Sequence, residues 1–446
     1  MNRVLASIVV VVSVCSGCGP ERPAALEPVK IGTIGSTSGA LATFGSALQD
    51  AIVLASENVN AAGGIFDGRP LELVIVDSTS DAAVAREKAN ELVEQGVVAI
   101  VGPETSGQSE QVLGIAENAK LPMVTCCATS TALSERAGPN EGFFFRTAPS
   151  DALQGQALAY AATQGVDVDG LDLAACPQAA FFSRGDSYGL GFKDVFSRHY
   201  QAAFVGEGRG RLIATGAFTS DAPSVAEIES AATAFTQAIV DNADPLQELC
   251  VVFITFGFEG ARLVKLIEDD LDDTALGYHY LTGDGAQEGA FLQEIGTAPP
   301  ALLPKIVGTV PFHAENAAYD EFAVAFEARH GSPPPAYSAQ AFDAMFITAL
   351  AVAKARSTEG VAIRNALFSV SGREGGRRFE NGNFFGEIAA AIDDGDDVDY
   401  VGPSGDLTFS AVGDVQGDYV LWQVESVGGS LAFVDKAPLP VSQFAE

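Results

Sequence analysis

Two hydroxyl residues stand where a parallel-sheet protein could hold an anion. Ser106 follows the apolar segment 97–101 at the start of a predicted helix, and Thr129 follows the apolar segment that ends at Thr125. In an open parallel sheet, ligands bind beyond the carboxyl ends of the strands, where a helix N-terminus offers free N–H groups and the positive end of a dipole. This placement predicts a carboxylate site, with ordinary helix N-capping as the alternative for both residues.

The chain offers little that would support catalysis or hold a metal or cofactor. The glycine-rich segment 32–39 lacks the spacing of a dinucleotide-binding loop, and the chain has no P-loop. The histidines show no metal-ligand spacing; they are His199, His279, His313 and His330. We therefore expect a protein that is not an enzyme and that carries no metal and no cofactor.

The charge balance limits the partners of the chain. Its 446 residues include 25 Lys and Arg against 58 Asp and Glu, which gives a formal net charge of −33. Such a field repels nucleic-acid phosphates and anionic lipid headgroups, so we expect no nucleic-acid partner and no polybasic membrane docking. The acidity is read as a contribution to solubility, in keeping with a saline habitat.

The N-terminus predicts export. One basic residue precedes a short apolar run, residues 4–14, and small residues lead to Cys18, so residues 1–17 are predicted to be a signal peptide. The small residues before Cys18 resemble a bacterial lipobox, which implies lipidation of Cys18 and a lipid-anchored protein of the periplasm or cell envelope. Cys15 stands where that motif usually has Leu, so plain signal cleavage remains an alternative. Residues 18–28 are expected to form an anchor and tether.

Four cysteines remain beyond the anchor. An exported compartment permits disulfides, and Cys176 and Cys250 each stand at the start of a predicted strand, so we expect a disulfide between them. The adjacent Cys126 and Cys127 would need a tight ring to pair with each other, and we expect two small core residues there.

Apolar strands alternate with helix-periodic segments after the tether. Strands are expected at 29–34, 71–76, 97–101, 122–125, 179–182, 250–254 and 278–281. Helices are expected at 46–60, 81–95, 108–119, 152–164, 189–200 and 260–270. This order predicts two α/β lobes, each a doubly wound parallel sheet covered on both faces.

A series of segments then carries a resemblance to a known family. They are Ile31-Gly-Thr-Ile-Gly-Ser-Thr-Ser-Gly39, 58–65, 68–73 with Asp77, 101–106, Phe145-Arg-Thr-Ala-Pro-Ser-Asp151, 186–189, 337–344 and 402–409. In this order the chain resembles the leucine/isoleucine/valine-binding proteins, the type 1 periplasmic receptors of amino-acid ABC importers. The resemblance implies three crossovers, near 147–150, 311–316 and 401–403. It places the first lobe at 29–148 and 315–401, and the second lobe at 149–314 and 402–446.

The resemblance also implies a ligand site. Ser106 and Thr129 would hold the ligand carboxylate, and the carbonyl of Cys127 and the side chain of Asp284 would hold its ammonium group. The aromatic residues of the cleft would be Phe44, Tyr188 and Phe256. Without the resemblance, we would interpret Tyr188 as a packed surface aromatic and Phe256 as part of the hydrophobic core. Asp284 would be interpreted as a turn residue, because it stands between two glycines. A disulfide common in the family is absent, because the matching positions are Ser80 and Thr105.

The resemblance finally implies a function. The chain would be a monomeric receptor that closes on a small amino-acid-like ligand and delivers it to ABC permease subunits in the inner membrane. The alternative is a sensory module of the same fold that signals to a partner protein.

Overall fold

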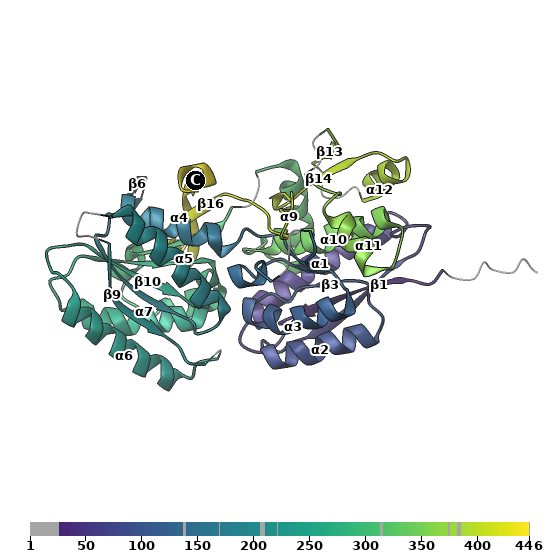
Figure 1. Cartoon of the computed structure of the whole chain (residues 1–446). Helices are drawn as coiled ribbons and strands as arrows, with labels where there is room; N and C mark the ends of the chain where they lie inside the picture. Colours follow the sequence, from purple (N-terminus) through teal and green to yellow (C-terminus); the bar gives the residue numbers. More distant parts are fainter. Residues whose placement is uncertain are drawn as a thin grey trace, which may run out of the picture.

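The computed structural model describes residues 26–136, 140–168, 170–205, 210–220, 222–312, 315–372, 375–380 and 385–445. The expected signal peptide, Cys18 and the first part of the tether lie outside the described residues. Two lobes, each built on its own sheet, stand side by side (Figure 1). Within the described residues, no helix is both long enough and apolar enough to cross a lipid bilayer.

The sheet of the first lobe has five parallel strands in the order β2-β1-β3-β4-β5. They are β1 (Val29–Gly35), β2 (Leu71–Asp77), β3 (Ile100–Val101), β4 (Met123–Thr125) and β5 (Phe144–Arg146). The strand order reverses between β1 and β3, and such a switch point leaves a crevice at the carboxyl ends of the strands. The connecting helices are α1 (Ala42–Ala61), α2 (Ala82–Glu94) and α3 (Ser106–Ala119).

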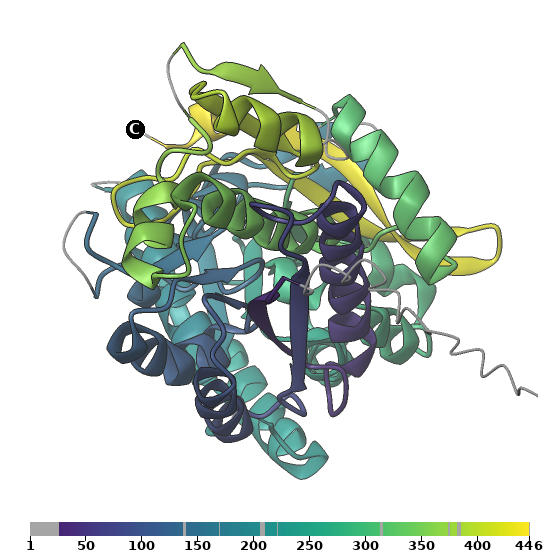
Figure 2. The ribbon, with the colours of Figure 1, turned by 90° about the vertical axis from the view of Figure 1, so that its right-hand side faces the viewer.

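A C-terminal segment completes this lobe. It contains α9 (Ala317–His330), α10 (Ser338–Ala355), α11 (Gly360–Leu367), α12 (Phe385–Asp393), β13 (Arg377–Phe379), β14 (Val398–Gly402) and β15 (Gly405–Asp406). Helix α10 is buried from Ser338 to Ala353, because it is apolar on nearly every side and packs between α1, α11 and α12. Figure 2 shows these green helices packed over the purple and blue N-terminal part.

We expected a wholly parallel sheet in the second lobe, but the sheet is mixed. Its order is β17-β16-β12-β11-β10-β8-β9, and β8 to β12 run parallel. These strands are β8 (Gln178–Ser183), β9 (Arg211–Ala217), β10 (Leu249–Ile254), β11 (Tyr278–Thr282) and β12 (Ile306–Pro311). The strands β16 (Tyr419–Val427) and β17 (Ser430–Leu439) form an antiparallel hairpin that extends the sheet at β12. Their tight Gly428–Gly429 turn leaves no room for a crossover helix.

Helices and a small hairpin complete the second lobe. They are α4 (Asp151–Gln164), α5 (Ser187–Ala203), α6 (Val225–Asn242), α7 (Gly257–Leu271) and α8 (Gly289–Ile295), with β6 (Val166–Val168) paired to β7 (Leu171–Leu173). A disulfide joins Cys176, just before β8, to Cys250 in β10, with Cα atoms 5.6 Å apart. This is the pair expected from the sequence, and both cysteines are buried.

The chain passes between the lobes three times. It crosses between β5 and α4, between β12 and α9, and again before β16. The third crossing comes later than the expected 401–403, because Phe409 still packs on Phe145 with ring centroids 5.1 Å apart. Val415 also belongs to the core of the first lobe.

Candidate functional site

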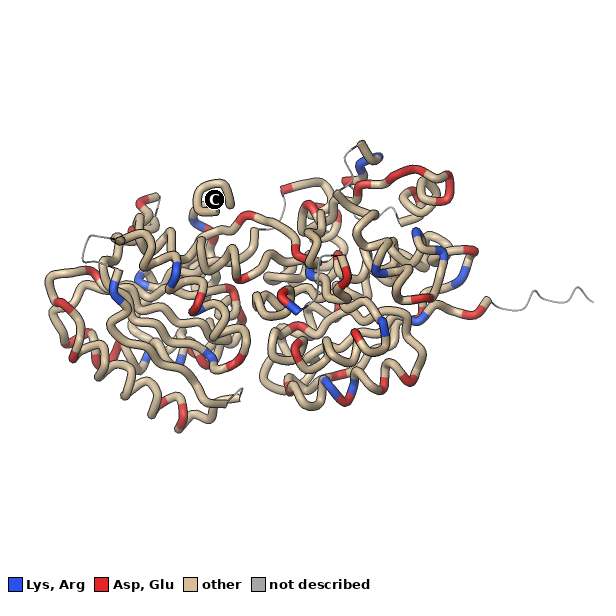
Figure 3. Tube along the Cα trace, in the orientation of Figure 1, with Lys and Arg blue, Asp and Glu red and all other residues tan. Residues whose placement is uncertain are grey.

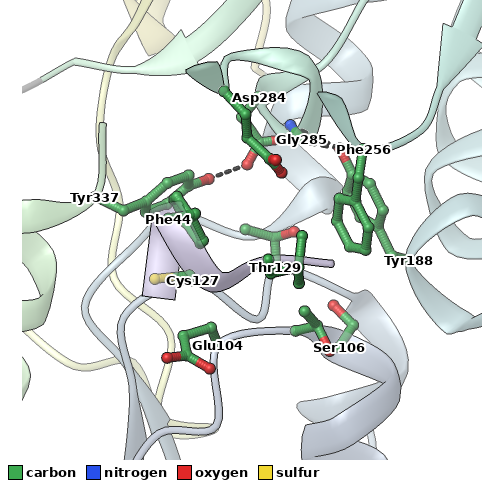
Figure 4. Close-up of a pocket in the computed structure, with 13 residues that line it drawn as sticks. Phe44, Glu104, Ser106, Cys127, Thr129, Tyr188, Phe256, Asp284, Gly285 and Tyr337 are labelled. Carbon is green, nitrogen blue, oxygen red and sulfur yellow. Dashed lines mark hydrogen bonds between the residues drawn. The ribbon is translucent and has the colours of Figure 1, made fainter. Parts of the chain in front are cut away.

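A pocket of about 430 Å³ lies between the two lobes. Its walls come from the loops and helix starts that follow the strands of both sheets, where the strand orders place a crevice. All seven residues expected to bind the ligand line this one pocket: Phe44, Ser106, Cys127, Thr129, Tyr188, Phe256 and Asp284. Figure 4 shows them converging from the two lobes on one space.

Ser106 and Thr129 form the hydroxyl wall on the first lobe. Ser106 is the first residue of α3, and its Oγ accepts a hydrogen bond of 3.2 Å from the backbone N–H of Ser130. Neither residue is a helix N-cap, because Thr105 caps α3 and Ser130 caps the short turn after Thr129. Both are almost fully buried, so their polar groups at a helix start suit an anion such as a carboxylate.

Cys127, which lines the pocket, takes part in a disulfide that was not expected from the sequence. The expectation that Cys126 and Cys127 are two separate core residues is wrong, because a disulfide joins them across adjacent Cα atoms 3.8 Å apart. Cys126 is buried in the core of the first lobe, whereas Cys127 lines the pocket. The pair therefore links the core to the wall of the site.

Asp284 is the central acid of the second-lobe wall. It is 6% exposed, and its carboxylate accepts a hydrogen bond of 2.8 Å from the hydroxyl of Tyr188 and another from the hydroxyl of Tyr337 across the cleft (Figure 4). Burial raises the pKa of Asp284, although the two tyrosines lower it in part. A cation that binds beside a buried carboxylate stabilises its charged form and offsets the cost of burial.

The glycines beside Asp284 permit this arrangement. A Cβ on Gly285 would lie 2.8 Å from the carbonyl oxygen of Thr255 and 3.0 Å from the hydroxyl of Tyr188. Any side chain there would push the tyrosine away from the acid. The Gly-Asp-Gly segment is thus a turn, as its composition suggests, and also the support of a buried carboxylate.

Aromatic rings close the sides of the pocket. The rings of Tyr188 and Phe256 are stacked with centroids 5.8 Å apart, and the guanidinium of Arg184 lies 4.3 Å from the centroid of Phe256. On the opposite side, Phe44 meets Tyr337 edge-on at 6.3 Å. Phe256 is half-buried against the core of the second lobe and also lines the pocket. It is therefore both a core residue and a residue of the site.

Sequence reasoning missed several residues of the site. Tyr337 has a left-handed backbone with φ of 69°, which no sequence signal predicts for a tyrosine. Glu104 lies between β3 and α3, two residues before Ser106, and the same strand-end signal could have found it. Glu288 follows Asp284 by one turn. Asp151 is buried where its backbone N–H donates to the carbonyl of Thr129, and burial and Asp284 raise its pKa.

A segment near the pocket resembles the nucleophile motif of hydrolases. Gly185 to Gly189 matches the Gly-x-Ser-x-Gly pattern of hydrolase nucleophiles. Ser187, however, is an ordinary first residue of α5, and its buried hydroxyl has no hydrogen-bond partner in the described part of the chain. A nucleophilic serine is activated by an adjacent general base, and no described group is hydrogen-bonded to this hydroxyl. Over the same residues, no group of three His, Cys, Asp or Glu could hold a metal ion.

Comparison with protein families and curated proteins gives a consistent result. Residues 28–390 match the family described as periplasmic binding protein. The chain is 32% identical over 131 residues to a leucine-, isoleucine-, valine-, threonine- and alanine-binding protein of Pseudomonas aeruginosa, a match that covers 29% of this chain and 34% of that protein. It is 26% identical over 411 residues to the chemotactic signal transduction system substrate-binding protein BasB of Halobacterium salinarum, which covers 90% of this chain and 88% of that protein.

Comparison with solved structures supports the fold. The substrate-binding protein LivJ of Streptococcus pneumoniae, solved with isoleucine, superposes with a TM-score of 0.67 at 21% identity, covering 92% of this chain and 100% of that one. The leucine-binding protein LivK of Thermotoga maritima gives a TM-score of 0.69 at 20% identity, covering 93% and 99%. Both are type 1 periplasmic binding folds, as expected from the sequence.

Proposed function

The chain belongs to the periplasmic binding protein family, and we propose on that basis that it is the solute receptor of an ABC importer and not an enzyme. The observation that carries the proposal is the pocket between the lobes. There the buried Asp284 stands across from Ser106 and Thr129 at a helix start. Such a pocket offers one wall for a cation and one for an anion.

The ligand would carry both an ammonium and a carboxylate group. The carboxylate would lie at Ser106 and Thr129, and the ammonium at Asp284 and the carbonyl of Cys127. An ionised group that leaves water for a closed cleft must be paired, because burial without a partner is very costly. The relatives from Pseudomonas aeruginosa and Streptococcus pneumoniae are described as binding amino acids, which supports the same ligand class.

Binding would close the lobes about the crossovers, and the permease would recognise the closed shape. A ligand that touches both lobes favours the closed state by its difference in affinity for the two states. Two contacts across the cleft support this proposal, namely the bond between Tyr337 and Asp284 and the 3.0 Å bond from the Ser130 hydroxyl to the carbonyl of Ser187.

The receptor would be held at the membrane by a lipid on Cys18. This part of the proposal rests on the sequence before and around Cys18 alone. Mass spectrometry of the membrane fraction should find an acylated Cys18 as the mature N-terminus. A chain that begins at Met1 in the cytosol would contradict both export and anchoring.

A ligand screen tests the central proposal. We expect at least one amino acid to raise the melting temperature of the purified mature protein, because a ligand that binds only the folded state stabilises it by mass action. Amines without a carboxylate and carboxylates without an amine serve as controls. A protein stabilised only by neutral compounds or simple anions would contradict the amino-acid ligand.

A sensory role is the second candidate. It is favoured by the match to BasB of Halobacterium salinarum, which spans 90% of this chain and is described as part of a chemotactic system. Genes for a permease and an ATPase beside the gene would support transport. A neighbouring transducer gene, with ligand-dependent capture of that transducer by the receptor, would support sensing.

A further inference from the structure

The cleft contains a second, larger cavity beside the pocket described above. It spans about 820 Å³ and is lined from both lobes. The two cavities share four lining residues: Leu41, Thr105, Phe256 and Glu288. They are therefore two compartments of one cleft, and a ligand held in the first can extend its side chain into the second.

The charges around the two compartments are strongly unequal. The lining residues include five acids, Glu104, Asp186, Glu259, Asp284 and Glu288, and one base, Arg184. Arg184 is only 3% exposed, and its Nε lies 2.8 Å from Asp186 while an Nη binds Glu259. Burial alone would lower the pKa of Arg184, but these two carboxylates raise it. Arg184 is thus fully engaged and does not offer its charge to a ligand.

Glu288 is one of three lining acids, with Glu104 and Asp284, that have no ion-pair partner among the described residues. It lies at the junction of the compartments and forms no ion pair with any described residue. The charged groups that face it are Glu259 on α7, Arg184 after β8 and Asp284 on its own segment. Burial, with Glu259 next in effect, raises the pKa of Glu288 to about 8. The carboxylate therefore gains free energy from any cation that reaches the junction.

We infer that the ligand carries a second positive group on its side chain, and that this group pairs with Glu288. The inference rests on the proposed amino-acid function and narrows it to cationic amino acids of the lysine, ornithine or arginine type. The apolar faces of Leu41 and Phe256 lie on the route between the compartments and suit the methylene stem of such a side chain. A neutral side chain would leave Glu288 unpaired when the cleft closes.

Calorimetric binding of L-arginine, L-lysine and the neutral L-norleucine tests the inference. The wild type should bind at least one of the two cations about tenfold or more tightly than norleucine. Glu288→Gln should weaken cation binding by about 30-fold or more, the loss typical when one partner of a buried pair is removed. Norleucine binding should change little in this variant. Glu87→Gln, at an exposed position of α2, is the matched control and should behave as the wild type.

The pH dependence of arginine binding distinguishes a charge partner from a merely structural role of Glu288. Because protons compete with the cation for Glu288, wild-type affinity for arginine should be roughly tenfold or more weaker at pH 6 than at pH 8. Glu288→Gln should lose that part of the dependence, and the remainder would reflect Asp284. A wild type that prefers norleucine to both cations, or a variant that keeps the preference for arginine, would overturn the inference while leaving the proposed function intact. If no amino acid binds at all, the proposed function fails and the inference fails with it.

Discussion

The site concentrates buried carboxylates that have no ion-pair partner among the described residues. Asp284 accepts hydrogen bonds from two tyrosine hydroxyls and forms no ion pair with a described residue, and burial raises its pKa. Glu104 accepts bonds of 3.0 Å from the backbone N–H and hydroxyl of Ser36, yet burial raises its pKa to about 7. Such residues cost stability in the free protein, which is common where side chains are arranged for binding. A cationic ligand would recover this cost.

The role of Asp284 can be tested with a variant that keeps its shape. Asp284→Asn should weaken amino-acid binding by about 2–5 kcal/mol, because the ammonium would lose its buried counter-charge. Ser106→Ala should cost less, because the backbone N–H groups at the start of α3 remain. Calorimetry with the best screened ligand measures both effects.

Thermal unfolding provides the control for that experiment. The ligand-free Asp284→Asn protein should melt no lower than the wild type, because a buried acid with a raised pKa has been replaced by a neutral group of the same size. If the variant binds the ligand as tightly as the wild type, the ammonium site is not at Asp284.

The alternation of strands and helices was predictable because parallel α/β lobes repeat it regularly. Apolar runs such as the one before Asp77 marked β2, and polar residues such as Asp81 marked the helix starts. The antiparallel hairpin of β16 and β17 was not predicted, because its alternating pattern lies beyond the repeated units. The strand expected at 97–101 is assigned only at Ile100–Val101, although the Val98 N–H still donates to the carbonyl of Lys30 in β1.

The site was predictable only in part, for physical reasons. Ser106, Thr129 and Asp284 follow strand ends, where ligands can bind, but the resemblance to a known family was needed to favour binding over capping or turn roles. Tyr337 and Glu288 reach the cleft through the packing of α10 and the turn after Asp284, which no local pattern reveals. The bond between Cys126 and Cys127 was missed because sequence adjacency alone argued against a ring.

The disulfide between Cys176 and Cys250 should stabilise the second lobe. It closes a segment with a sequence separation of 74 and so restricts the unfolded chain. Replacing both cysteines with alanine should lower the free energy of unfolding by about 3–5 kcal/mol, measured by guanidinium denaturation. The matched Cys126→Ala/Cys127→Ala variant removes a disulfide between adjacent residues, which encloses no segment of the chain. Its free energy of unfolding should therefore fall much less. Equal losses in the two variants would contradict this entropic account.

The three crossovers join lobes that each have a core of their own. Because the cores are separate, the lobes can rotate as rigid bodies while the crossovers take up the change. Small-angle X-ray scattering should therefore show a smaller radius of gyration with saturating ligand than without it. Identical scattering profiles with bound ligand, verified by calorimetry in the same buffer, would exclude hinge closure.

Charge also acts on the molecule as a whole. Asp and Glu cover both lobes, with few Lys and Arg between them (Figure 3). A net charge of −33 opposes the compact state, and salt screens this repulsion over about 3 Å at 1 M ionic strength. Buried carboxyls are screened much less. In high salt the repulsion among surface charges is therefore largely screened, while the contribution of the buried carboxyls to stability remains.

The buried carboxyls give stability a definite dependence on pH. Glu104 and Asp343 each have a pKa raised by burial to about 7, so between about pH 4 and pH 7 the folded protein binds more protons than the unfolded chain. Their contribution is fully present below the unfolded pKa values and is lost as the pH rises through 7. Carboxyls with a lowered pKa, such as Asp77, act only near pH 4 and below. Burial lowers the pKa of His279, and this one group opposes the carboxyls below about pH 6.5. In 1 M NaCl, the free energy of unfolding should therefore fall as the pH rises from 5 to 8.

A single substitution can assign part of that slope. Each proton contributes at most about 1.4 kcal/mol per pH unit, so Glu104→Gln should flatten the dependence by up to that amount between pH 5 and pH 7. Urea denaturation of the ligand-free protein across this range provides the measurement. Glu87→Gln removes an exposed carboxyl of the same lobe and should keep the wild-type slope. A Glu104→Gln slope equal to that of the wild type would show that Glu104 is ionised throughout the range, and that the hydrogen bonds from Ser36 outweigh its burial.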